Sequence, residues 1–161
     1  MNNVMKHLFK HIRARRAASL AACVLLLAAC DKVPINGVLD GMWQLTTIAT
    51  PDTVRHTTAE QLFVSFQLHL TQWEKKTTGA TIYAHFTHRA DSIAFSDFAE
   101  RALHDLSAGD DDHIFTPAQM AGGVMDAWGI HSANARFRVM ELNHTTLVLH
   151  DADTTLTFRK F

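Results

Sequence analysis

Over residues 62–71, a row of apolar residues at every second position alternates with a row that is polar apart from Phe63. A two-residue period places every second side chain on the same face of a β-strand, whereas a helix cannot bury one face with that spacing. The pattern therefore predicts one strand over residues 62–71, with its apolar row buried. That row consists of Leu62, Val64, Phe66, Leu68 and Leu70.

Shorter stretches with the same alternation occur on both sides of this segment. Turn-forming residues such as Lys75–Gly79 and Arg89–Asp91 separate the first of them, and tight turns between consecutive strands are typical of an antiparallel meander. Towards the end of the chain, the breaks at 143–145 and 151–153 have the length of hairpin loops. We therefore predict a mainly β, antiparallel fold of about seven or eight strands. Besides 62–71, the predicted strands are 39–49, 80–88, 92–98, 135–142, 146–150 and 155–161.

One short helix is predicted before the last three strands. Thr116-Pro117-Ala118-Gln119 forms a capping-box sequence with proline at the first helical position. Met120, Val124 and Trp128 then follow at helical spacing, and Gly129 is placed to end the helix. Because Gly122 and Gly123 each weaken a helix by roughly 1 kcal/mol relative to alanine, this one should form only where it packs against another part of the protein.

The first 29 residues have the composition of an export signal. Residues 1–16 contain five cations and no acid, and residues 17–29 are apolar apart from Ser19. A cationic head followed by an apolar stretch of this length is typical of a secretory signal, and the stretch is too short to span a bilayer. We expect residues 1–29 to be removed.

The end of this signal, Leu27-Ala28-Ala29-Cys30, resembles the lipobox of bacterial lipoproteins. The resemblance implies cleavage before Cys30, acylation of that cysteine with palmitate-type chains, and a lipid-anchored protein of the cell envelope, on the outer membrane. An ordinary signal followed by a chance cysteine is the alternative. The expected organisation is a signal at 1–29, the lipidated cysteine and a polar tether at 30–38, and a barrel domain at 39–161.

Removal of the signal changes the charge and leaves no free thiol. The mature part keeps 10 of the 15 Lys and Arg against 16 Asp and Glu, a formal charge of −6. Such a balance argues against nucleic acid as a partner and against a basic surface that holds anionic lipid. Because Cys23 leaves with the signal and Cys30 would carry lipid, no cysteine remains for a disulfide or a thiolate catalyst.

The segment Asp40-Gly41-Met42-Trp43-Gln44-Leu45 opens the first predicted strand, and Leu156–Phe161 closes the last. Together with the lipobox, this pattern resembles the lipocalin-like lipoproteins of Gram-negative bacteria of the Bacteroidetes type. The resemblance implies an up-and-down barrel in which the first and last strands pair. It also implies that Gly41 and Trp43 form the barrel floor and that Arg159 lies across the Trp43 ring in a cation–π contact. Lipocalins usually carry their helix after the barrel, so its predicted position here is a departure.

The leading functional hypothesis is a non-enzymatic binding module for a small apolar ligand that enters one barrel mouth. An eight-stranded barrel is just wide enough to be filled by side chains or to hold one small ligand. A filled barrel that serves as an accessory subunit of an envelope protein complex is therefore the alternative. The sequence names no protein partner and predicts no cofactor. The candidate ligand-binding residues are Trp43, Phe66, Phe86, Met120, Val124 and Trp128.

Nine histidines remain after removal of the signal and raise a third hypothesis, a metal-dependent enzyme. His69, His85 and His88 fall on segments expected to be neighbours, and two imidazoles with a carboxylate would suit a divalent ion. His104 and Asp110–Asp112 have no ligand spacing of a known site. We interpret the histidines as surface residues and predict no metal site. No motif of a serine hydrolase, zinc protease or phosphate-binding loop is present.

Overall fold

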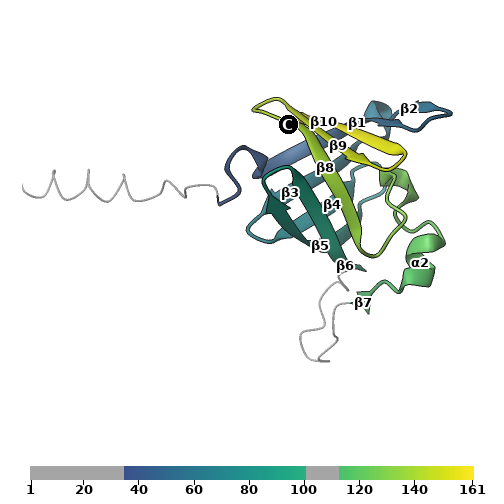
Figure 1. Cartoon of the computed structure of the whole chain (residues 1–161). Coiled ribbons are helices and arrows are strands. Elements are labelled where there is room, and N and C mark those ends of the chain that lie inside the picture. The colour runs from purple at the N-terminus through teal and green to yellow at the C-terminus, as the bar shows by residue number, and fades with distance from the viewer. Residues whose placement is uncertain (1–34, 101–112) are drawn as a thin grey trace, which may run out of the picture. The chain divides into compact units, whose positions relative to one another are not determined.

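Eight antiparallel strands close into a barrel in the structure, a computed structural model that describes residues 35–100 and 113–161. Strands of the ring follow one another in chain order, and the last strand pairs with the first (Figure 1). The predicted up-and-down barrel is thereby confirmed. The ring consists of β1 (Gly41–Ala49), β3 (Leu62–Gln67), β4 (Leu70–Lys75), β5 (Ala80–Arg89), β6 (Ser92–Glu100), β8 (Ala135–Leu142), β9 (Thr146–Asp151) and β10 (Thr154–Lys160).

Short elements lie outside this ring. Strand β2 (Val54–His56) pairs with β1, and strand β7 (His113–Ile114) pairs with β6. None of the helices among the described residues has the length and apolarity needed to cross a membrane. They are η2 (Gly37–Leu39), η3 (Thr58–Glu60), α2 (Pro117–Ala121) and η4 (Asp126–Trp128).

The segment predicted as one strand over residues 62–71 is in fact a hairpin. Gln67 pairs with Leu70 across a two-residue turn in which Leu68 has φ 57°. As a result Leu68 and Leu70 are about half exposed, at 52% and 48%, whereas the first half of the predicted row is buried. Glycine or asparagine usually marks such a turn, and this chain places leucine there. The six other predicted strands agree with the structure to within two residues.

The two ends of the barrel are closed differently. At the floor end, where β1 begins and β10 ends, η2 packs against Trp43, and the Trp43 indole N–H donates to the carbonyl of Leu39 at 2.8 Å. The tether predicted to extend to residue 38 is therefore folded from Asn36 onward, because the Asn36 amide donates to Asp40 and to the carbonyl of Leu68. At the other end lies α2, on the side away from residues 35–40 (Figure 1).

Aromatic side chains fill the middle of the barrel. Phe95 is 1% exposed and lies against four other rings, with centroids between 5.2 and 6.4 Å from its own. Aromatic pairs at such distances stabilise a core by about 0.5–1.5 kcal/mol each beyond the area they bury. This part of the interior is therefore packed by side chains. The four neighbouring rings are those of Phe66, Trp73, Phe98 and Phe137.

Candidate functional site

Residues 115–130, here called the cover segment, contribute side chains to the core at the end of the barrel opposite the floor. Met120 and Met125 are fully buried and Trp128 is 3% exposed, while Val124 packs against the core in part. The Trp128 ring meets that of Trp73 edge to face, with centroids 6.4 Å apart. The cover segment thus closes this end with flexible methionines and one large ring, instead of with a strand.

The sequence explains why the cover segment is irregular. The predicted capping box is present at Thr116, whose hydroxyl accepts from the backbone N–H of Gln119. The predicted continuous helix to Trp128 is wrong, however, because α2 ends at Ala121 and Gly123 adopts φ 94°, which side-chain-bearing residues rarely adopt. The chain then forms the separate turn η4, which Gly129 ends with φ 70°.

Gly129 also allows close packing of the cover segment on the barrel. A Cβ added at this position would lie 3.1 Å from Leu156 Cδ2 and 3.2 Å from Ile48 Cγ2. Both partners are core residues of the closing strands β10 and β1. The glycine expected to stop the helix therefore also lets its backbone approach the rim of the barrel.

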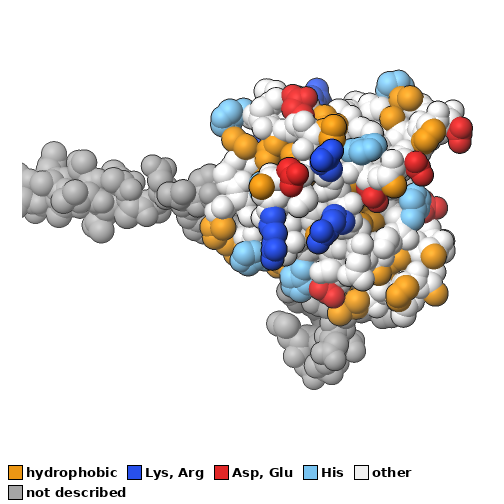
Figure 2. All heavy atoms as spheres, viewed as in Figure 1, with side chains coloured by type: hydrophobic (Ala, Val, Ile, Leu, Met, Phe, Trp, Pro, Cys, Tyr) orange, Lys and Arg blue, Asp and Glu red, His pale blue; other side chains and the backbone are white. Residues whose placement is uncertain are grey.

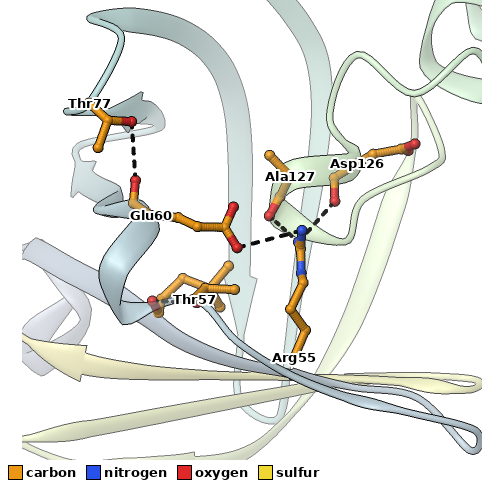
Figure 3. A network of polar contacts seen from close by, with 7 residues as sticks. Arg55, Thr57, Glu60, Thr77, Asp126 and Ala127 are labelled. Atoms are coloured by element: carbon orange, nitrogen blue, oxygen red, sulfur yellow. Dashed lines mark hydrogen bonds and ion pairs between the residues drawn. The ribbon is translucent and has the colours of Figure 1, made fainter.

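Arg55 on β2 fastens the cover segment from outside (Figure 3). Its Nη2 donates to the carbonyls of Asp126 and Ala127, at 3.3 and 2.6 Å, and its Nη1 lies 3.7 Å from the Glu60 carboxylate. The Glu60 carbonyl in turn accepts from the Thr77 hydroxyl at 3.4 Å (Figure 3). Since the Arg55 side chain is 43% exposed, these bonds compete with water and hold the segment only moderately.

Replacing Arg55 with glutamine is expected to speed hydrogen exchange of the Trp128 and Gly129 backbone amides by roughly fivefold, equivalent to about 1 kcal/mol of local opening. Both amides donate within the cover segment, to Met125 and Asp126, so their exchange reports on its opening. Glu60→Gln, which removes only the long ion pair, should have a smaller effect. Unchanged exchange in Arg55→Gln would show that the arginine does not hold the cover segment.

The three tryptophans differ in how their indole N–H groups are bonded. Trp43 donates to Leu39 O at 2.8 Å, and Trp73 donates to the Thr71 hydroxyl at 2.9 Å. The buried Nε1 of Trp128 has no hydrogen-bond partner among the described residues. A buried donor without an acceptor costs about 1–3 kcal/mol, which makes this group the clearest polar feature of the covered end.

At the floor, the cation over Trp43 is Lys160, so the prediction of Arg159 in that place is wrong. Lys160 Nζ lies 4.3 Å from the Trp43 ring centroid and donates to the carbonyls of Val38 and Asp40. Burial lowers the pKa of Lys160, an effect that the Asp40 carboxylate opposes. The register explains the difference, because Trp43 pairs with Lys160 while Arg159 pairs with Gln44 and donates to its side chain at 2.7 Å.

Three of the six predicted ligand-binding residues, Trp43, Phe66 and Phe86, lie on strands of the barrel. Phe66 pairs in register with Gly41, two residues from Trp43, and meets Phe86 edge to face at 5.1 Å. The other three belong to the cover segment. The sequence did not point to Trp73, because the predicted strand ended at Thr71. The Trp73 ring lies against those of both Phe95 and Trp128. The sequence also did not point to Arg55, which has no recognisable motif.

The histidines do not assemble into a metal centre in the part of the chain that the structure describes. Within residues 35–100 and 113–161, no group of three or more His, Cys, Asp or Glu side chains is placed to hold a metal ion. His69 lies in the β3–β4 turn, and His85 Nδ1 lies 3.2 Å from the Asp97 carboxylate. The signal, Cys30, His104 and Asp110–Asp112 lie outside the described residues.

Comparison with known proteins agrees with this architecture. The family model of the lipocalin-like domain matches residues 25–161. The chain belongs to this lipocalin-like family. Among solved structures, a lipocalin-like protein from Bacteroides uniformis is 22% identical, with a TM-score of 0.55, and the match covers 78% of this chain and 100% of that one. An uncharacterized protein from Bacteroides eggerthii is 21% identical, with a TM-score of 0.53, 76% coverage of this chain and 99% of its own.

These two structures show the shared fold only, and curated proteins give no match. The resemblance to the lipocalin-like proteins of Bacteroides species is confirmed. A fold of this family supports a binding role in general.

Proposed function

We propose that this protein is a membrane-anchored, non-enzymatic binding module that takes up a small apolar ligand beneath the cover segment. The observation that carries this proposal is the buried indole N–H of Trp128, which lacks a partner among the described residues. It lies at the inner surface of the cover segment, next to Trp73 and among buried methionines. An apolar ligand with one hydrogen-bond acceptor would satisfy it.

The construction of the cover segment supports entry at this end. Gly122 and Gly123 interrupt it, and the exposed Arg55 holds its second half through two backbone carbonyls. Methionine side chains adapt to irregular shapes because they are unbranched and polarizable. Movement of Met120 and Met125 would therefore make room for a ligand, while the aromatic middle of the barrel and the Trp43 floor stay in place.

Displacement of a fluorescent apolar probe, N-phenyl-1-naphthylamine, tests the binding proposal. We expect the probe to bind and both 1-decanol and n-decane to displace it. Trp128→Phe should weaken 1-decanol about fivefold, the effect of losing one neutral hydrogen bond, while leaving n-decane unchanged. Tyr83→Phe on the outer face of β5 serves as a control for general effects. Failure of all three molecules to bind the wild-type protein would contradict the proposal.

Anchoring through Cys30 is the second part of the proposal. It is supported by the charged head, the apolar stretch and the lipobox in the expected order. Cys30→Ser is expected to move the protein from the membrane fraction to the soluble fraction and to remove the mass of the acyl chains from its N-terminal peptide. Cys23→Ser, within the predicted signal, is the matched control. Retention of Cys30→Ser in membranes without its acyl chains would contradict lipid anchoring.

A specific observation favours a second function, that of an accessory subunit in an envelope protein complex. The Phe95 ring and the four rings around it already fill the middle of the barrel. A barrel without space would act through its outer surface. Purification of a stoichiometric protein partner, together with no probe binding, would favour this alternative over the ligand-binding one.

A further inference from the structure

A hollow of about 230 Å³ lies between β5, β6 and β8, and no residue of the cover segment lines it. Its polar rim is formed by side chains that alternate outward on these strands, opposite the buried row of Phe86, Phe95 and Ala135. The volume is below the range of about 300–1,000 Å³ typical for drug-sized ligands, so it suits a small group. The lining residues are His85, Phe86, Thr87, Ala94, Phe95, Ser96, Asn134, Ala135 and Arg136.

The course of β6 explains the hollow. Its pairing with β8 ends at Phe95 and Ala135, after which β6 continues beside β7 at Ala99 and Ile114. The β5–β6 pairing also shifts register between Tyr83 and His85, opposite Asp97 at φ 53°. Strands β6 and β8 therefore separate next to Asn134, and the hollow results from the strand pairing itself.

Unpaired cations gather on the same face. Arg138 pairs in register with Ser92, which in turn pairs with Arg89, and Arg136 lies two residues from Arg138 on the same side of β8. Among the described residues, none of these three arginines forms an ion pair. Figure 2 shows basic side chains grouped over the middle of this face. This is unusual for a mature chain with a formal charge of −6.

The carboxylate of Asp97, next to the lining residue Ser96, is already engaged. Asp97 Oδ2 lies 3.2 Å from His85 Nδ1 and accepts from the Ser96 hydroxyl at 2.9 Å. Its negative charge would repel an anion from that side of the hollow. An anion would consequently lie toward Arg136 and Asn134, whose guanidinium and amide groups are donors.

We propose that this hollow is a second binding site, for the phosphate group of a small molecule or lipid headgroup, held by Arg136 with Asn134. The guanidinium presents a planar fork of N–H donors, which matches phosphate oxygens in pairs. Arg138 and Arg89 add long-range attraction from one side. None of the lining residues belongs to the cover segment, so this site can be tested without an apolar ligand.

Titration of the full chain at low salt, followed through the backbone amide signals of Asn134 and Arg136, tests this site. The probes are inorganic phosphate, glycerol 1-phosphate and monomeric dihexanoyl-phosphatidylglycerol. Arg136→Gln is expected to weaken binding about tenfold, the scale of one lost charge-assisted pair of hydrogen bonds. Lys75→Gln is the control, because it removes the same charge at a distance from the hollow. Lys75 lies roughly 17 Å along β4 from Leu70, the residue that pairs with His85, so its loss should leave the affinity unchanged.

The probes also separate the two sources of the phosphate group. Tighter binding of the short-chain lipid than of glycerol 1-phosphate would assign the site to a membrane headgroup, and equal binding would assign it to a free phosphate ester. Absence of binding by all three probes would overturn the proposal. Equal weakening by Arg136→Gln and Lys75→Gln would also overturn it, because binding would then follow net charge alone.

Discussion

Replacing Trp43 with alanine is expected to lower the free energy of unfolding by about 3–5 kcal/mol. The side chain is fully buried at the floor, its indole N–H donates to Leu39, and Lys160 lies over its ring. The substitution removes all three contributions and leaves a cavity. Because small domains are stable by only about 5–15 kcal/mol, the variant should be near the limit of folding. Urea unfolding followed by circular dichroism measures the change.

Two further variants show which basic residue supports this floor. Lys160→Met should reduce stability in the Trp43 background but much less in the Trp43→Ala background, since the ring it covers is then absent. Arg159→Met removes a bond from the exposed arginine to the buried Gln44 side chain and should act equally in both backgrounds. The reverse pattern would mean that Arg159, and not Lys160, is coupled to the tryptophan.

Replacing Phe95 with alanine is expected to cost a similar amount, about 3–5 kcal/mol. The ring lies at the centre of the aromatic cluster, against Phe66, Trp73, Phe98 and Phe137. Its removal leaves a cavity that the surrounding rings cannot fill without leaving their own positions. Chemical denaturation gives the free energy, and binding of xenon or benzene by the variant would report the cavity directly.

Phe161→Ala is the matched control for this prediction. The same atoms are removed, but Phe161 is 69% exposed, and its ring meets that of Phe63 with centroids 5.0 Å apart. We expect a loss below about 1.5 kcal/mol. Equal effects of the two substitutions would show that the middle of the barrel is not packed as described.

The strands were predictable because one face of each barrel strand is buried in the core and the other faces solvent. Buried apolar residues therefore recur at every second position, as Ile82, Ala84 and Phe86 do. The β3–β4 turn escaped prediction because Leu68 carries no turn signal and continues the apolar period. Arg159 and Lys160 are neighbours in the chain and therefore point to opposite faces of β10. Only the register of β10 with β1 decides which of the two meets Trp43.

The candidate site was predictable only in part. The capping box and the glycines are local signals, and Met120 and Trp128 are apolar residues that a packed segment must bury. The contact between Trp73 and Trp128 joins residues 55 positions apart, and the bonds of Arg55 to carbonyls carry no side-chain pattern at all. Such contacts form only once the strands have closed into a barrel, and no local sequence pattern indicates which distant residues closure brings together.

The indole N–H signals of the three tryptophans test the central claim most directly. Trp43 and Trp73 already donate within the protein, whereas Trp128 has a free buried donor among the described residues. The Trp128 indole signal is assigned as the one that is absent from the spectrum of Trp128→Phe. On titration of the wild-type protein with 1-decanol, this signal should move downfield while the Trp43 signal stays in place. A ligand that shifts the Trp43 signal and leaves that of Trp128 unchanged would contradict binding beneath the cover segment.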